Sequence, residues 1–202
     1  MAFRFSNRPH KQFLWFLIRR DSRLSRGKGV GIDAGCADMR NKRFFETLSY
    51  VGIDIDESQL AIGQKRCPEA KVLTCSILDV PNRIKGDFLH CIQVFVNADF
   101  ENKQAVDVTR KLVSMVRKDG VLLMNTGRKT LAYDHEILEI LSRHFDQVRV
   151  VRYGNWGISR QSIFLSLVVA SFMYFFPFSR TWGGHSKTYF KCEGRNTAPK
   201  LI

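Results

Sequence analysis

Cysteine is sparse in this 202-residue sequence, which contains five cysteines and no C-x-x-C pair. An odd count without that spacing disfavours a disulfide framework and a four-thiolate zinc site, and it favours a reducing compartment. The G-x-G-x-x-G pattern of dinucleotide-binding proteins is also absent, which disfavours a nicotinamide cofactor. The apolar run at 13–18 is too short for the core of a signal peptide, and no small-residue cleavage site follows it, so secretion is disfavoured.

Positive charge and aromatic residues gather at the two ends of the chain. The formal charge is +13, from 32 basic and 19 acidic residues. Residues 1–30 and 143–202 each carry +7, whereas residues 31–142 carry −1. The same two ends hold 17 of the 24 aromatic residues. Basic, aromatic flanks around a neutral module indicate a surface for an anionic partner, either lipid headgroups or nucleic acid.

Apolar periodicity predicts strands that alternate with helices. Strands are expected at 29–35, 50–55, 71–75, 87–94, 121–124, 147–153 and 187–192. Helices are expected at 10–24, at 39–48 with Asp38 as the cap, at 58–66, at 104–116 and at 134–143. This alternation predicts an α/β fold, doubly wound around a mostly parallel seven-stranded sheet. The last strand is expected to be antiparallel, with an apolar insertion before it.

Three features of a nucleotide site follow one another along the chain. The first expected strand runs into the turn Asp33-Ala34-Gly35-Cys36, where a glycine lets the backbone approach a ligand and a helix is expected to follow. Asp54 ends the second strand, 21 residues after Asp33, at the spacing of an acid that accepts hydrogen bonds from ribose hydroxyls. The segment Ser76-Ile77-Leu78-Asp79-Val80-Pro81 follows the third strand.

Residues 28–153 resemble the class I S-adenosylmethionine-dependent methyltransferases. Gly31-Ile32-Asp33-Ala34-Gly35-Cys36 is similar to their first motif, and Lys118-Asp119-Gly120 fits the turn before their fifth strand. The resemblance implies a Rossmann-like methyltransferase fold and S-adenosylmethionine as the cofactor. It also implies cofactor-binding residues, which are Asp33, Gly35, Cys36 and Ala37 for the methionine end, Asp54 and Ile55 for the ribose, Ser76 and Ile77 for adenine, and Gln93 beside the methyl group.

The sequence departs from the family pattern at four positions. Ala37 and Met39 replace the second and third glycines of the first motif, and Met39 is tolerable if it already lies in the following helix. Ser76 replaces an acid, and Asn97 replaces a histidine that the family often carries near the end of its fourth motif. No single residue is therefore assigned as the catalytic base.

Three residues are candidates for that base because the loops after strands four and five face the site in this fold. They are His135, Asp99 and Tyr133. Asp134 is expected to cap a helix instead. A hydroxyl acceptor would need a base, whereas a thiolate, a free amine or a carboxylate would not.

The segment 161–179 is uncharged over 19 residues and is bounded by Arg160 and Arg180. A straight helix of that length would reach about 28 Å. Because strands of one sheet are expected on both sides of it, a single crossing of a membrane is disfavoured. Contact with a membrane surface, together with the basic residues 11–20, is the favoured interpretation, and a buried lid or a dimer contact is the alternative.

The sequence therefore predicts a basic, aromatic N-terminal helix in residues 1–27 and a methyltransferase domain in residues 28–202 with an apolar insertion at 157–184. The expected enzyme lies on the cytoplasmic side of a membrane, peripheral or monotopic, and methylates a small-molecule, hydrophobic, lipid-linked or glycan-pathway acceptor. One alternative is an RNA or protein methyltransferase, although the N-P-P-Y-type tetrad of many base N-methyltransferases is absent. The other is a non-catalytic binding or scaffold protein with the same fold.

Overall fold

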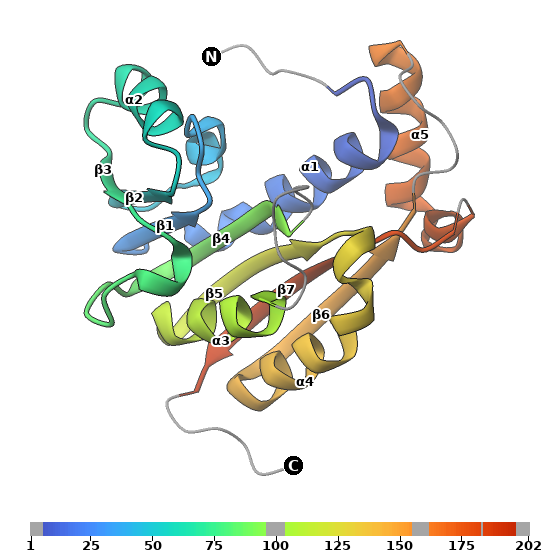
Figure 1. Ribbon diagram of the computed structural model, residues 1–202. Helices are drawn as coiled ribbons and strands as arrows, with labels where there is room; N and C mark the ends of the chain where they lie inside the picture. Colours follow the sequence, from blue (N-terminus) through green and yellow to red (C-terminus); the bar gives the residue numbers. More distant parts are fainter. Residues whose placement is uncertain (1–5, 96–103, 155–161, 183, 197–202) are drawn as a thin grey trace.

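A computed structural model describes residues 6–95, 104–154, 162–182 and 184–196. Its centre is a seven-stranded sheet in the order β3-β2-β1-β4-β5-β7-β6 (Figure 1). The strands are β1 (Val30–Ala34), β2 (Ser49–Asp54), β3 (Lys71–Thr74), β4 (Gly86–Phe95), β5 (Val116–Thr126), β6 (Phe145–Tyr153) and β7 (Lys187–Arg195). The strands β1 to β5 pair in parallel, and β7 runs antiparallel to both of its neighbours. The predicted fold class is confirmed.

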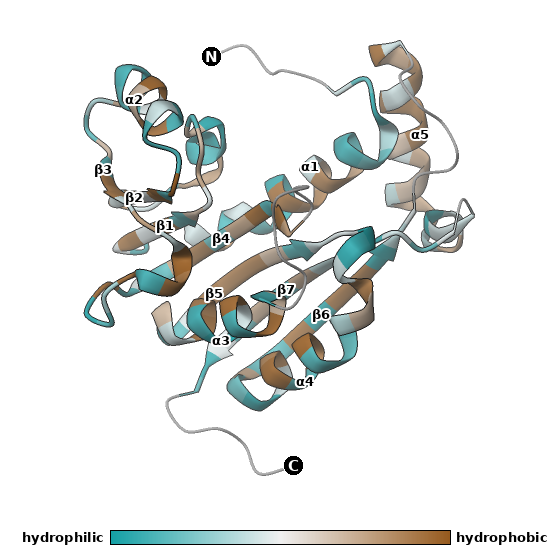
Figure 2. Cartoon of the chain, viewed as in Figure 1, coloured by the Kyte–Doolittle hydropathy of each residue, from teal (hydrophilic) through white to brown (hydrophobic). Residues whose placement is uncertain are grey.

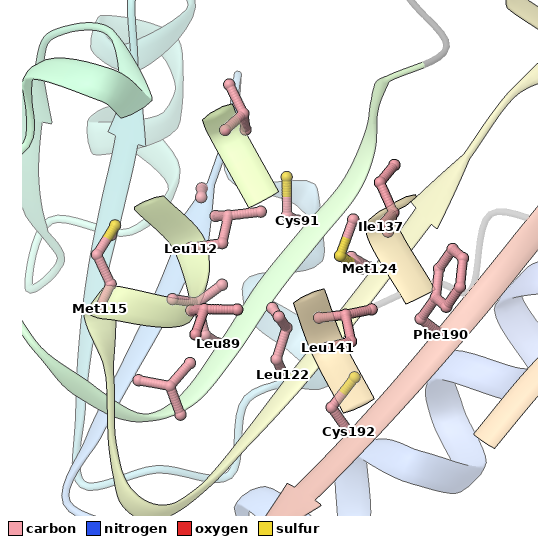
Figure 3. Close-up of a cluster of buried hydrophobic side chains, with 14 of the residues drawn as sticks. Leu89, Cys91, Leu112, Met115, Leu122, Met124, Ile137, Leu141, Phe190 and Cys192 are labelled. Atoms are coloured by element: carbon pink, nitrogen blue, oxygen red, sulfur yellow. The ribbon is translucent and has the colours of Figure 1, made fainter. Parts of the chain in front are cut away.

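Helices cover both faces of the sheet. They are α1 (Pro9–Asp21), α2 (Glu57–Arg66), α3 (Ala105–Met115), α4 (Asp134–His144) and α5 (Ile163–Phe175). On one face α3 and α4 bury alternate residues of the central strands, among them Leu89, Cys91, Leu122 and Met124 (Figure 3). On the other face α1 and α5 bury the residues in between, including Phe88 and Leu123. Because successive strand residues point to opposite faces, the apolar runs of β4 and β5 serve two separate cores.

The helix α1 is fixed to the sheet by a buried carboxylate as well as by packing. Its residues Phe13 and Leu17 are fully buried, and Phe13 meets Tyr153 of β6 edge to face at 5.3 Å. At its C-terminal end, Asp21 accepts two hydrogen bonds from Arg20 at 2.7 Å and one from the hydroxyl of Tyr189 at 3.0 Å. The first helix is thereby tied to the last strand of the chain.

The helix expected at 39–48 is wrong, and a short 3-10 helix over Arg40–Phe44 stands there instead. Met39 adopts a left-handed conformation with φ 56°, so an α-helix cannot begin at Asp38. The carboxylate of Asp38 does not cap a helix but pairs with Arg40 and Arg66. Phe45 then turns back to the sheet and packs edge to face against Tyr50.

Two other helix starts differ from the sequence prediction. The helix α2 is capped by Asp56, whose side chain accepts a hydrogen bond from the amide of Gln59. Asp134 is the first residue of α4 and not its cap, because its carboxylate accepts hydrogen bonds from the hydroxyls of Thr126 and Thr188. Short polar side chains therefore predict both helix starts to within two residues. At α4, however, the hydroxyls of neighbouring strands occupy the carboxylate that was expected to cap the helix.

The apolar segment 161–179 is interrupted. The helix α5 ends at Phe175, and a short 3-10 helix over Pro177–Thr181 follows, because a residue before proline is pushed out of the helical region. Ser166, Val169, Ala170 and Met173 of α5 are buried, and the helix lies beside α1 (Figure 1). Among the described residues, no helix combines the length and apolar character that a membrane crossing requires.

Candidate functional site

A cavity of about 1620 Å³ opens at the carboxyl ends of β1, β2 and β4. Eight of the nine residues assigned to the cofactor from the sequence line it, namely Gly35, Cys36, Ala37, Asp54, Ile55, Ser76, Ile77 and Gln93. Open parallel sheets place ligand sites at this edge, beside the point where the strand order reverses. Here the order reverses between β1 and β4, so the topology brings these separate segments together.

Asp54 ends β2 and joins the turns that follow two strands. Its Oδ2 accepts a hydrogen bond from the amide of Ala37 at 2.7 Å, and its Oδ1 accepts one from the amide of Asp56 at 3.0 Å. An ionised carboxylate has about four acceptor positions, so two remain for a ligand. The side chain is half-buried and faces the cavity. This geometry suits a pair of neighbouring hydroxyl groups on a bound ligand.

The turn after β1 contains three residues with positive φ angles, the backbone conformation that glycine favours, although just one of them is a glycine. Gly35 has φ 76°, and the two positions where glycine is missing, Ala37 and Met39, have φ 44° and 56°. Ala37 and Met39 therefore adopt a conformation that residues with a Cβ atom disfavour. At Gly35 itself a Cβ atom would lie 2.2 Å from Val94, so a side chain there would strike β4.

Packing compensates for the left-handed conformation of Met39. Its side chain is 1% exposed and fills the space above Gly63 of α2, where an added Cβ would lie 2.8 Å from the Met39 Cγ. Leu60 and Cys36 belong to the same buried cluster. The third glycine position thus carries a core residue, and the sequence expectation that Met39 lies in a helix is wrong.

Asp33 is the one assigned cofactor residue that does not line the cavity. It is fully buried, and its Oδ2 accepts a hydrogen bond from the Tyr50 hydroxyl at 2.9 Å. Its register partner on β4 is His90, which is also fully buried and packs against Phe45. Within the described residues, neither ring nitrogen of His90 has a hydrogen-bond partner.

Burial shifts the pKa values of Asp33 and His90 in opposite directions from their ordinary values. It raises the pKa of Asp33 to about 7, although the Tyr50 hydrogen bond opposes the rise. It lowers the pKa of His90 to about 3. Both groups therefore favour their neutral forms in the folded protein.

The remaining assigned residues form the walls of the cavity. Ser76 begins the 3-10 helix Ile77–Asp79 and its hydroxyl accepts a hydrogen bond from the Leu78 amide. Ile55 is 75% exposed, which leaves an apolar surface beside Asp54 for a flat ring. Burial raises the pKa of the Cys36 thiol far above its usual range, so this cysteine is a packing residue rather than a nucleophile.

Gln93 lies at an irregularity of β4. The pairing of β4 with β5 shifts register between Cys91 and Phe95, and Gln93 adopts a left-handed conformation with φ 68°. The backbone amide of Gln93 donates a hydrogen bond to Asn125 Oδ1 at 2.7 Å, and this bond holds the bulge in place. Bulges of this kind re-aim side chains and gather near active sites. The fully buried Asn125 is a supporting residue that sequence analysis missed, because its partner comes from a neighbouring strand.

The structure does not bring two of the three candidate bases, His135 and Tyr133, to the cavity. His135 is exposed on the first turn of α4, and Tyr133 packs against the core beneath α3 and α4. Neither lines the cavity. Asp99 lies outside the described residues.

The N-terminal helix contributes a cavity wall, whereas sequence analysis assigned its residues only to a surface for an anionic partner. Lys11 and Trp15 of α1 line the cavity together with Arg43. The Lys11 ammonium lies 5.8 Å from the Trp15 ring centre, and the Arg43 guanidinium lies 5.3 Å from it. The basic, aromatic composition of residues 11–20 marks this segment as a contact surface but does not indicate that it faces the cavity.

Solved structures resemble the chain in fold at low sequence identity. The N-methyltransferase NodS from Bradyrhizobium japonicum WM9 aligns with a TM-score of 0.62 at 13% identity, over 91% of this chain and 97% of NodS. The magnesium protoporphyrin IX methyltransferase ChlM from Synechocystis PCC 6803, solved with bound SAM, aligns with a TM-score of 0.59 at 15% identity, over 92% of this chain and 80% of ChlM. This chain has the class I methyltransferase fold.

The class I fold supports more than one kind of chemistry. The [4+2]-cyclase SpnF aligns with a TM-score of 0.58 at 12% identity, over 90% of this chain and 80% of SpnF. No protein-family model matches the chain, and no curated protein matches it in sequence. The activity therefore has to be argued from the site.

A first prediction concerns the left-handed turn. Ala37→Gly should change the free energy of unfolding by less than about 0.5 kcal/mol, since the relief of backbone strain offsets the entropy that glycine adds to the unfolded chain. Met39→Gly should lose about 2 kcal/mol or more because it also removes a buried side chain. Urea denaturation measures both, with Ala132→Gly in an exposed helical turn as the control that should lose about 1 kcal/mol. A loss at Ala37 equal to that at Ala132 would contradict the strained turn.

A second prediction uses the two opposed pKa shifts. The folded protein holds neutral His90, so its contribution is complete above the unfolded pKa near 6.5 and is lost as pH falls toward 3. Asp33 behaves in the opposite sense, because its folded pKa is raised and its contribution is lost as pH rises from about 4 toward 7. Relative to the native sequence, His90→Phe should gain stability as pH falls from 6.5, and Asp33→Asn should gain stability as pH rises toward 7.

Urea unfolding at a series of pH values measures, for each variant, how the difference in unfolding free energy from the native protein changes with pH. Each slope has a ceiling of about 1.4 kcal/mol per pH unit. Parallel slopes for the two variants, or no slope for either, would refute the assignment of neutral buried forms.

Proposed function

We propose that the protein is an S-adenosylmethionine-dependent methyltransferase. The observation that carries the proposal is the position of Asp54, whose carboxylate faces the cavity while its two oxygens hold the amides of Ala37 and Asp56. The left-handed turn from Gly35 to Met39 and the segment Ser76-Ile77 stand on either side of it. NodS and ChlM, which share the fold, were crystallised with S-adenosylhomocysteine or SAM.

The residues that line the cavity fit this cofactor by chemical type. Asp54 offers the two remaining acceptor positions to the ribose diol. Ile55 and Ile77 offer apolar surface to adenine, and Ser76 offers a hydroxyl at the ring edge. Arg40 and Arg43 line the cavity and would face the carboxylate of the methionine end. The volume of about 1620 Å³ exceeds that of ordinary small-molecule sites, so it has room for an acceptor as well.

When bound, S-adenosylmethionine supplies a methyl group on a positively charged sulfur, and the transfer is a displacement at carbon. The protein's work is then to position the acceptor in line with that methyl group and to exclude water. Gln93, aimed from the bulge of β4, and Val94, against Gly35, would border the reacting atoms. The side chains of Trp15 and Ile92 add apolar wall on the side of α1.

The cofactor assignment is tested by calorimetry with S-adenosylhomocysteine. Asp54→Asn should weaken binding by about tenfold or more, because it removes a charged acceptor for the diol. Glu57→Gln is the matched control, since this exposed residue lies three positions away, loses the same charge and does not line the cavity. Equal affinity in the two variants would place the ribose elsewhere.

We further propose that α5 docks on an anionic membrane surface and that the acceptor is lipid-linked or hydrophobic. The outer side of α5 and the turn after it expose large apolar side chains, which are Ile163, Phe164, Leu165, Val168, Phe175, Phe176, Phe178 and Trp182. Brown colouring along α5 in Figure 2 shows the same concentration of hydrophobic residues. A helix of 13 residues is about 20 Å long, which suits a position in the plane of the interface.

Positive charge accompanies this apolar surface. Arg180 follows α5 and donates to the carbonyl of Met173 at 2.9 Å. Arg149 and Arg20 lie close enough for their charges to lower the pKa of Arg180, after the larger effect of burial. Basic residues beside exposed aromatic side chains are typical of proteins that bind anionic lipid surfaces.

Flotation with vesicles of phosphatidylcholine and phosphatidylglycerol tests the membrane contact. Phe164→Ser with Phe175→Ser should reduce the bound fraction several-fold, because both side chains are more than 70% exposed on α5. The control replaces Leu48 and Ile62, which are exposed apolar residues away from α5, by serine and should float like the native protein. Equal flotation of the two double variants would exclude docking through α5, and salt-sensitive binding to RNA alone would favour the polymer alternative.

A further inference from the structure

Three basic side chains meet beside the cavity without an acidic partner. Arg8 precedes α1, Lys11 lies in its first turn, and Lys187 begins β7. Within the described ranges 6–95, 104–154, 162–182 and 184–196, none of the three forms an ion pair. The three residues are called the basic cluster below. They come from opposite ends of the sequence and are brought together by the docking of α1 on the last strands.

The basic cluster is continuous with the cavity wall. Lys11 lines the cavity itself, and its ammonium lies 5.8 Å from the ring centre of Trp15, another wall residue. Tyr153, the register partner of Lys187 on β6, packs against Phe13 of α1 at 5.3 Å. The start of β7 therefore lies next to the first turns of α1.

The electrostatics of the cluster are unfavourable in the protein alone. Burial lowers the pKa of Lys11, and the charges of Arg8 and Arg40 lower it further. Burial also lowers the pKa of Lys187, followed by the charges of Arg8 and Lys11. The first turn of α1 contains no acidic residue, so the positive end of its dipole adds to the same field.

Folding thus holds two half-buried lysines and an arginine together at a cost that no described side chain offsets. The pair Lys42–Glu69, at 2.8 Å and also on the cavity wall, shows how the same chain neutralises a lysine with a carboxylate. A positive cluster of this kind, which extends from the cavity-lining residue Lys11, attracts anions.

We propose that the basic cluster of Arg8, Lys11 and Lys187 binds an anionic group, a phosphate or a carboxylate, on the methyl acceptor. The proposal rests on the methyltransferase function proposed above and names the class of its acceptor. The cofactor's own carboxylate is assigned to Arg40 and Arg43, near the turn after β1. The acceptor's anionic group would lie on the α1 side, which leaves its methylated atom directed toward Gln93.

The same chemistry can come from a lipid headgroup or from a soluble phosphorylated compound. The helix α5, with its exposed apolar surface, packs directly against α1. An amphiphile held in the interface by its chains could therefore present its headgroup to the first turn of α1.

The test measures anion binding in protein saturated with S-adenosylhomocysteine. Calorimetry with glycerol 3-phosphate probes a soluble acceptor, and flotation with phosphatidylcholine–phosphatidic acid vesicles probes a lipid headgroup. Lys11→Gln combined with Lys187→Gln should weaken the binding of at least one probe by about tenfold or more, since each lysine donates a charged hydrogen bond. The control Lys71→Gln with Lys118→Gln removes the same charge from exposed positions at the amino ends of β3 and β5, and it should stay within about twofold of the native protein.

Three results would overturn the proposal. The native protein could bind neither probe, or the two double variants could lose affinity equally, which would reduce the effect to net charge. A parallel loss of S-adenosylhomocysteine affinity in the Lys11 and Lys187 variant would assign these lysines to the cofactor. Failure of the native protein to bind S-adenosylhomocysteine would instead refute the proposed function, so the two failures are separable.

Discussion

The carboxylate of Asp54 is the interaction on which the site depends. It accepts one hydrogen bond from the turn after β1 and one from the residue that caps α2, so it fixes the two loops that frame the cavity. A charged acceptor is suited to this task because amide hydrogen bonds to a carboxylate are stronger than those to a neutral group. The same anchoring leaves acceptor positions directed at the cavity. Structural support and ligand recognition therefore share one side chain.

The turn after β1 shows how a fold is kept when its usual glycines are lost. A left-handed residue without glycine costs about 1–2 kcal/mol, and two such residues follow Gly35. The amide of Ala37 is held by Asp54, and the side chain of Met39 is buried against Gly63, so each strained residue has a compensating contact. The strain is tolerated where the structure over-determines it, next to the cavity. These contacts account for a left-handed turn in a segment that contains a single glycine.

Much of the architecture follows from local patterns in the sequence. Alternating and continuous runs of apolar residues predict the strands. The spacing from Asp33 to Asp54 predicts that the ends of β1 and β2 lie together. The prediction of a helix after Asp38 is wrong because Met39 has a left-handed backbone, and the helix propensities of the residues do not indicate that conformation. The side chain of Asp33 turns away from the cavity because the Tyr50 hydroxyl holds it within the sheet face. Lys11, Trp15 and Asn125 escape prediction since their roles arise from contacts between distant segments.

Residues of the N-terminal helix α1 line the cavity together with the strand ends that carry the cofactor motifs, and α5 packs against α1. The central claim is that the Asp54 side binds the nucleoside, and a crystal structure with S-adenosylhomocysteine tests it most directly. The account predicts both ribose hydroxyls within hydrogen-bond distance of the Asp54 carboxylate, with the Ala37 and Asp56 amides still bound to it. A ligand whose ribose lies away from Asp54, or a carboxylate that releases the Ala37 turn to bind it, would contradict the account.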